Sequence, residues 1–325
     1  MTVKILSDDF KLSGMLDNII FARYNEGAYY AGHAFLIIPF DKSHYEALKP
    51  PSRLLIEDMP YTVEKIRCVD DQIEISARGV FHDFSQFALT APKTFAKKPS
   101  EMVCELANGV TFRGIQYGVY GIGDFSEPQK ERVEWCTSYE RAISALCAEN
   151  DLCFRMTFDG ESRELKFLLD NCVDRSIENP LGYSVISDKR TPFLDLELIR
   201  DISSYKTRVE LLFRISTING YRSAVIDRTP SDEMARTYTE IVDFPAESFS
   251  DIDGYLERRC EALLAAHPKT NELRVRISGK ITHRAGQICY FESERLGESF
   301  KALIKDREYV MGQYEEYEEL ILEVR

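Results

Sequence analysis

Short runs of alternating apolar and polar residues recur near both ends of the chain. Alternation with a period of two places apolar side chains on one face of a strand, and the polar residues between the runs favour tight turns. Three runs near the N-terminus cover residues 54–57, 62–67 and 72–79, and three looser runs near the C-terminus cover residues 288–291, 299–304 and 320–324. The sequence therefore predicts two similar antiparallel β-barrel-like modules, related by pattern more than by identity.

The middle third has a different pattern, with helices ahead of a hairpin. An apolar strand over residues 34–40 and an amphipathic helix over residues 81–89 complete the first module, and a segment with Pro92 and Pro99 follows it. The later elements are a helix from Ser100 to Asn108-Gly109, a glycine-rich loop or connection over residues 114–128, a helix capped by Thr137 and Glu140, and a hairpin of residues 152–158 and 165–169 around Asp159-Gly160. This part is predicted to be α+β.

The last third opens with strands and contains one long helix. Residues 193–199 read as a strand, and residues 208–216 and 221–227 form a hairpin through Asn219-Gly220. A helix starts at Ser250 and Asp251 and ends at His267-Pro268. We therefore expect an α+β, β-rich chain with a first barrel-like domain at residues 1–95, a middle α+β domain at 96–190 and a second barrel-like domain at 191–325.

Composition supports a folded, multidomain protein. The 325 residues are 44% hydrophobic and 29% charged, which is ordinary for a globular chain. No apolar run approaches the roughly 20 residues that cross a bilayer, so we expect no membrane insertion and synthesis in the cytoplasm. The net charge of −13 disfavours tight nucleic-acid binding, although an acidic wall would let DNA slide past without sticking.

Candidate chemistry is sparse. The eight cysteines form no Cys-x-x-Cys pair and the five histidines are scattered, so we expect no metal site. The pair His82-Asp83 falls on the helix expected at residues 81–89, where a boundary role is favoured over catalysis. Neither residues 121–126, as a dinucleotide loop, nor Ser203 with Lys206, as a Ser-x-x-Lys motif, has the required context. The acidic residues 314–319 lack calcium-loop spacing and are expected in a solvated strand or loop. No catalytic, cofactor-binding or metal-binding residue is proposed, and no cofactor.

Three stretches together resemble a known family. They are the strand at residues 35–39 with the three strands after it, residues 201–209 leading into the Asn219-Gly220 hairpin and residues 236–238, and the helix at 251–266 with the strands that follow. In this order they resemble the hub proteins of phage and prophage tails, which are found at siphophage tail tips and in contractile-tail baseplates. The resemblance spans most of the chain.

The resemblance implies a structural role in a virion tail assembled in the host bacterial cytoplasm. In that family two barrel-like domains per chain form a homotrimer with six similar units, which adapts a threefold hub to a sixfold tail tube. It implies tail tube and distal tail proteins, with spike or fibre proteins, as partners, and a channel through which DNA passes without specific binding. Many relatives continue into a peptidase, lysozyme or receptor-binding region, whereas this chain stops at Arg325. We therefore expect that it is not an enzyme and that any lytic activity resides elsewhere.

Two alternatives of other classes stay open. A hydrolase acting on cell-wall polymer would need convergent carboxylates, and 54 acidic residues select no pair. A carbohydrate-binding module would use exposed aromatic side chains, for which Tyr24, Tyr29, Tyr30 and Tyr117 are candidates.

Overall fold

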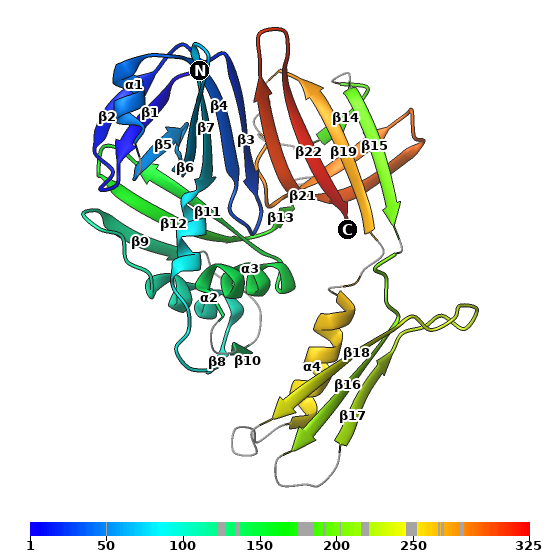
Figure 1. Ribbon diagram of the computed structural model, residues 1–325. Helices are drawn as coiled ribbons and strands as arrows, with labels where there is room; N and C mark the ends of the chain where they lie inside the picture. The colour runs from blue at the N-terminus through cyan, green and yellow to red at the C-terminus, as the bar shows by residue number, and fades with distance from the viewer. Residues whose placement is uncertain are drawn as a thin grey trace. The chain divides into compact units, whose positions relative to one another are not determined.

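The chain folds into two compact units, each described here by itself (Figure 1). The first contains Met1–Leu198 and Glu272–Arg325, and the second contains Ile199–Asn271. The division into three domains at residues 95 and 190 stays a prediction. The computed structural model describes residues 1–49, 51–121, 128–133, 137–174, 185–190, 193–201, 203–215, 221–244, 252–265, 267, 270–279 and 283–325.

The first strands of the chain confirm the alternating pattern. The N-terminal elements are β1 (Val3–Ser7), β2 (Leu12–Leu16), β3 (Phe21–Gly27), β4 (His33–Pro39), α1 (Lys42–Ala47), β5 (Ser52–Ile56), β6 (Met59–Val69), β7 (Gln72–Gly79) and the 3₁₀ helix η1 (Val80–Gln86). Along β7 the apolar Ile73, Ile75 and Ala77 are buried and the polar residues between them are partly exposed, as a strand with one covered face requires.

The middle part contains a three-stranded sheet, a two-stranded sheet of β8 and β10, and two helices. Its elements are β8 (Lys93–Lys97), α2 (Pro99–Asn108), β9 (Gln116–Gly121), β10 (Gln129–Val133), α3 (Tyr139–Glu149), β11 (Leu152–Asp159) and β12 (Glu164–Asn171). β11 and β12 form the expected hairpin, and β9 adds to β12 in parallel. The glycine-rich segment thus contributes a strand over residues 116–121, while residues 122–127 lie outside the described part.

The remaining strands and one helix complete the chain. They are β13 (Val173–Asp174), β14 (Val185–Ser187), β15 (Phe193–Asp201), β16 (Arg208–Ile215), β17 (Tyr221–Asp227), β18 (Thr237–Phe244), α4 (Ile252–Ala265), β19 (Thr270–Ser278), β20 (Gln287–Ser293), β21 (Glu298–Met311) and β22 (Glu316–Val324). In the second unit, β16 pairs with β17 antiparallel and with β18 in parallel. The Asn219-Gly220 turn and the helix start at Ser250 and Asp251 lie outside the described residues.

One sheet of fourteen strands runs through the first unit. Its strand order is β15-β19-β22-β21-β3-β4-β7-β6-β5-β1-β2, with β20 beside β21 and with β13 and β14 beside β20. The expected α+β, β-rich class is confirmed. The described strands form one continuous sheet and no closed barrel. β21 pairs with β3, whereas closing either half of the sheet into a barrel would require pairing between strands of the same half.

The predicted duplication has a topological counterpart. We define the first module as β3 to β7 and the second module as β15 with β19 to β22. Numbered a to e along the chain, the five strands of each module lie side by side in the order a-b-e-d-c. Strand d, which is β6 in one module and β21 in the other, pairs first with c and then with e, and its register shifts close to that change. A register shift at the corresponding point indicates a shared local bend.

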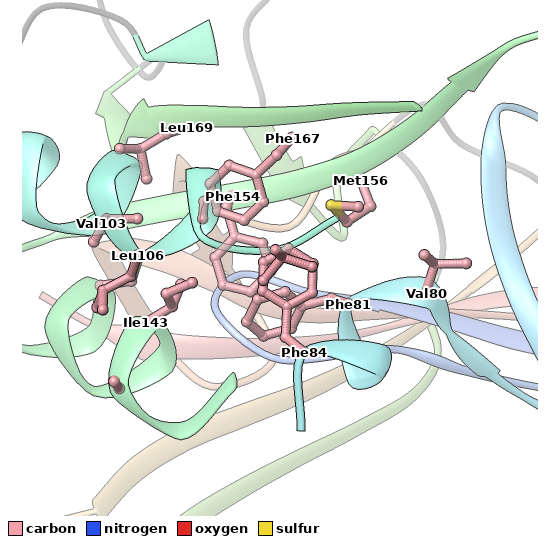
Figure 2. Close-up of a cluster of buried hydrophobic side chains, with 14 of the residues drawn as sticks. Val80, Phe81, Phe84, Val103, Leu106, Ile143, Phe154, Met156, Phe167 and Leu169 are labelled. Carbon is pink, nitrogen blue, oxygen red and sulfur yellow. The ribbon is translucent and has the colours of Figure 1, made fainter. Parts of the chain in front are cut away.

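Three separate hydrophobic clusters hold the first unit together. The first module packs around Tyr61 and Leu36, the second around Phe291 and Leu322, and the middle part around Phe167. Figure 2 shows the middle cluster, where Phe81 and Phe84 of η1 meet Phe154 and Phe167 of the hairpin. In the second unit, apolar side chains of α4 cover one face of its sheet.

Two helix predictions were wrong in detail. Residues 81–89 do not form an α-helix: the 3₁₀ turn stops at Gln86, and the backbone of Phe87 is extended. The amide of Leu89 instead donates to the Thr137 carbonyl, since burying Leu89 beside α3 outweighs helical continuation. The cap of α3 is Ser138, whose hydroxyl accepts from the Arg141 amide at 3.3 Å, and not Thr137.

Candidate functional site: the seam and free edges of the duplicated sheet

The two modules are joined by main-chain pairing. β21 runs antiparallel to β3, from Asp306 opposite Gly27 to Met311 opposite Ala22. These segments are about 280 residues apart in sequence, and Figure 1 shows them side by side at the middle of the sheet. We call this pairing the seam. It makes strand a of one module the direct neighbour of strand d of the other.

Polar side chains fix the register of the seam. The Asn25 amide nitrogen donates to both carboxylate oxygens of Asp306 at 3.1 and 3.0 Å, and the Tyr30 hydroxyl donates to the same carboxylate. Burial raises the pKa of Asp306, while the bonds from Tyr30 and Asn25 act in the opposite direction. Gly32 is required beside this network, because a Cβ atom there would lie 2.1 Å from the Asn25 carbonyl oxygen.

A buried ionic cluster lies at the seam. Arg307 of β21 is 4% exposed and bonds Glu318 of β22, which is fully buried. Glu318 also contacts the His283 ring at 3.2 Å, and Glu26 of β3 lies 3.9 Å from the Arg307 guanidinium. Burial lowers the pKa of Arg307, but the charge and hydrogen bond of Glu318, together with the nearby Tyr24 and Glu26, raise it above its ordinary value. Burial raises the pKa of Glu26.

This cluster corrects the expectation for the acidic residues 314–319. Tyr314 and Glu315 are exposed as expected, but β22 begins at Glu316 and turns Glu318 into the core. Burial of a carboxylate is tolerated here because the Arg307 guanidinium and the His283 ring contact it. Nothing in the local acidic pattern marks Glu318, since its partners Arg307 and His283 lie on other segments.

A cavity of about 740 Å³ adjoins the cluster. Phe154, Leu168 and Leu169 form its apolar wall, and Arg155 and Arg284 contribute charge. Both guanidinium groups approach Asp58, at 3.7 and 3.9 Å. Among the described residues no group of three or more His, Cys, Asp or Glu side chains has the geometry of a metal site. The cavity therefore has a charged and an apolar part.

The sheet also has main-chain edges with no partner in the described part of the chain. At its ends these are β2, with Leu12 61% exposed, and β15, with Leu194 57% exposed. A third is the outer edge of β6 beyond its register shift, where residues 65–69 pair only with β7. Unpaired edges are positions at which another chain can add to a sheet.

His82 and Asp83, considered as a base and its orienting acid, have separate partners in this fold. His82 contacts Glu140 at 3.0 Å, whereas Asp83 accepts from Arg53 at 2.7 Å, so the two do not form a base with its orienting acid. The favoured boundary role of His82 agrees with its partly exposed position on η1. The described cysteines are free thiols, and Cys136 lies outside the described residues.

The four tyrosines considered for carbohydrate binding are buried or only partly exposed. Tyr24 is 2% exposed and donates to Glu57 at 2.9 Å, and Tyr30 bonds Asp306 in the seam. Tyr117 is partly buried and donates to the Ala107 carbonyl at 3.3 Å, and Tyr29 packs against the middle cluster. Tyr24 is therefore buried, whereas Tyr29, Tyr30 and Tyr117 are partly exposed and contact other residues of the chain.

Comparisons with solved structures identify the fold. A tail protein of Neisseria meningitidis is 11% identical and superposes with a TM-score of 0.67, over 99% of this chain and 96% of the other. The 43 kDa tail protein of prophage MuSo2 of Shewanella oneidensis is 12% identical and superposes with a TM-score of 0.63, over 99% of this chain and 98% of the other. This chain has the fold of phage and prophage tail proteins. The resemblance seen in the sequence is thus confirmed for the fold.

A similar fold occurs in a component of the type VI secretion system. An Escherichia coli component of the type VI secretion system, described as structurally similar to phage T4 tail proteins gp27 and gp5, is 8% identical. Its TM-score is 0.52, over 94% of this chain and 73% of that one. No protein-family model and no curated protein matches the sequence. None of the described helices has the length and apolarity needed to cross a membrane.

Proposed function

We propose that this chain is a structural hub protein of a phage or prophage tail that assembles as a homotrimeric ring. Each copy would supply two similar modules, so that three copies present six units to a sixfold tail tube. The ring would adapt the tube to distal spike or fibre proteins in the virion tail. DNA would pass through its channel without specific binding.

The observation that carries this proposal is the repeated a-b-e-d-c strand order together with the seam. The seam joins two modules side by side through strands a and d, so it is a head-to-tail contact inside one chain. A head-to-tail contact whose rotation closes generates a ring. Duplication of a module followed by trimerisation gives a threefold object with six similar parts, which suits a sixfold neighbour.

The polar face of the sheet would line the channel. Arg23 pairs with Glu308 at 2.7 Å across the seam, and Arg276 bonds Glu319 at 2.9 Å on the neighbouring strands. Since the whole chain carries a net charge of −13, we expect an acidic channel that repels phosphate. A basic lumen in the electrostatic map of the assembled ring would contradict the DNA-passage part of the proposal.

Mass measurement and imaging test the ring. The purified chain is examined over a wide concentration range by light scattering and native mass spectrometry, alone and with its tail tube protein. We expect a species of three times the chain mass of 37.4 kDa and annular particles in electron micrographs. A chain that stays monomeric in both settings, or that forms only twofold dimers, would overturn the hub proposal.

We further propose that the chain is not an enzyme and does not bind glycans. Among the described residues no metal-ligand group lines the cavity beside Glu26, and the hydroxyls of Tyr24, Tyr30 and Tyr117 are bonded to other residues of the chain. Incubation with purified peptidoglycan should release no soluble fragments, and a glycan array should show no binding. Turnover that a point substitution in the cavity abolishes would contradict this part.

A further inference from the structure

Two cysteine side chains meet at one end of the β11–β12 hairpin. Cys153 is the second residue of β11, and Cys172 directly follows β12. The antiparallel register places Cys153 opposite Asp170, and the Cys172 amide donates to the Asp151 carbonyl at 2.9 Å. Cys153 and Cys172 are therefore diagonal neighbours on the same face of the hairpin, and their thiols are hydrogen-bonded to each other. We call them the thiol pair.

The thiol pair lies where the hairpin meets the second module. Cys172 is followed by β13, which pairs with β20 of that module. Gly286, the residue before β20, faces Cys153, because a Cβ atom at Gly286 would lie 2.6 Å from the Cys153 sulfur. Only a residue without a side chain leaves room there for the thiol. A bond between Cys153 and Cys172 would therefore join the start of β11 to the chain segment that enters the large sheet.

The thiol pair can be reached from solvent and is arranged to react. Cys153 lines the cavity of about 740 Å³, and both side chains are partly exposed. The hydrogen bond from Cys153 and the charge of Arg325 lower the pKa of Cys172, whereas the same hydrogen bond raises the pKa of Cys153. Cys172 is thus the thiol that ionises first, and the thiolate is the nucleophile in disulfide exchange. By contrast, Cys147 is fully buried, and burial raises its pKa.

We propose that Cys153 and Cys172 form a reversible disulfide by exchange with a low-molecular-weight disulfide such as oxidised glutathione. The Cys172 thiolate attacks one sulfur of the small disulfide and displaces a thiolate, which leaves a mixed disulfide on Cys172. Cys153 then loses its proton, attacks the Cys172 sulfur and releases the second small thiolate. The chain gives up two electrons and two protons, and the small disulfide is reduced to two thiols.

The disulfide changes how firmly the hairpin is held at its junction with β13. Because a cross-link restricts the unfolded chain, the oxidised form should be the more stable one. Cytoplasmic thiols are kept reduced, and oxidation takes place outside the cell. In a tail protein the bond would therefore form after the virion leaves its host. This setting rests on the proposed hub function, whereas the chemistry of the thiol pair does not.

Oxidation of the purified chain tests the thiol pair, whether or not the chain forms a ring. The reduced chain is incubated with oxidised glutathione, remaining thiols are alkylated at acid pH, and linked peptides are mapped by mass spectrometry. We expect a peptide linked through Cys153 and Cys172, whereas the exposed Cys68 should gain a glutathione adduct. The oxidised chain should unfold about 4–6 °C above the reduced chain, and dithiothreitol should reverse this shift.

Two variants separate the thiol pair from the other cysteines. Cys172→Ser should abolish both the link and the thermal shift, and the matched control Cys68→Ser should retain both. Separate adducts on Cys153 and Cys172, alkylation of both after oxidation, or a link from either to Cys147 would overturn the proposal. Peptide mapping of the wild type decides this without any substitution. Absence of the link leaves the hub proposal intact, and a linked chain that never forms a ring would overturn the hub alone.

Discussion

The two modules share a strand order but differ in how strand d is covered. In the second module, β21 is flanked along residues 306–311 by β22 and β3, and it accommodates Arg307 and Glu318 as a buried pair. In the first module the corresponding residues 65–69 of β6 have one neighbour and carry exposed charge. The comparison shows that the same position becomes core or surface according to whether strand a of a module lies beside it.

The modules also differ in where extra chain is inserted. The first has α1 between strands b and c, whereas the second has the whole unit of residues 199–271 between strands a and b. Both insertions leave the a-b-e-d-c order unchanged. Connections at strand ends can thus grow while the pairing that defines the module persists.

The largest effect is expected from breaking the buried pair of the second module. Arg307→Ala leaves Glu318 as a buried charge whose remaining partner is His283, and should lower the free energy of unfolding by about 3–5 kcal/mol. Arg67→Ala, at the corresponding d strand of the first module, should change it by less than about 0.5 kcal/mol. Urea unfolding followed by circular dichroism measures both. Equal losses of unfolding free energy in the two variants would contradict the inference that strand d is buried in the second module and exposed in the first.

Core truncation tests whether the seam couples the modules. Leu36→Ala removes a fully buried side chain from the first module, and Leu322→Ala does so in the second. Each should cost about 2–5 kcal/mol and should shift the same unfolding transition, because the seam makes one continuous sheet. Hydrogen exchange monitored by mass spectrometry reports each module separately. Loss of protection confined to the substituted module would contradict coupling through the seam.

A pH-dependent effect is expected from Glu26 at the seam. Burial raises the pKa of Glu26 above its ordinary value of 4.5, so the folded state favours its neutral form. Its stabilising contribution is complete below the unfolded pKa and is lost as the pH rises through the folded pKa. Glu26→Gln stays neutral and should therefore gain stability relative to the wild type as the pH rises from acid to neutral.

The control for this pH effect is Glu161→Gln, which alters an exposed carboxylate in the turn between β11 and β12. Its unfolding free energy should follow the wild type at every pH. A Glu26→Gln variant that loses stability relative to the wild type as the pH rises would contradict the assigned direction of the pKa shift. Denaturant midpoints across the pH series provide the measurement.

The smallest effect is expected at the insertion specific to the first module. The Asp41 carboxylate caps α1 by accepting from the Ser43 and His44 amides at 2.8 and 3.1 Å. Asp41→Ala should cost about 1 kcal/mol or less, because α1 is short and contains no buried side chain. Assembly should be unchanged. A loss of the oligomer on this substitution would place α1 in an interface and call for a different ring.

The sequence by itself determined the local elements of this protein. Alternation of apolar and polar residues predicted β7 with both of its ends. The β11–β12 hairpin and α2 also lie where periodicity and the Gly and Pro positions predicted them. These signals depend on residues only a few positions apart. The repeat of strand patterns at the two ends of the chain could likewise be recognised from the sequence. What only the tertiary structure decided concerns partners far apart in sequence.

Three features depended on such partners. The seam joins residues 22–27 to residues 306–311, Glu318 is buried by Arg307 and His283, and residues 81–89 leave the helix so that Leu89 can pack beside α3. No local pattern records these choices, because an alternating strand has the same sequence pattern whether its edge is paired or free. Burial of an edge or a charge is settled by the free energy of the whole packed sheet, in which the distant segment supplies the missing hydrogen bonds and countercharge.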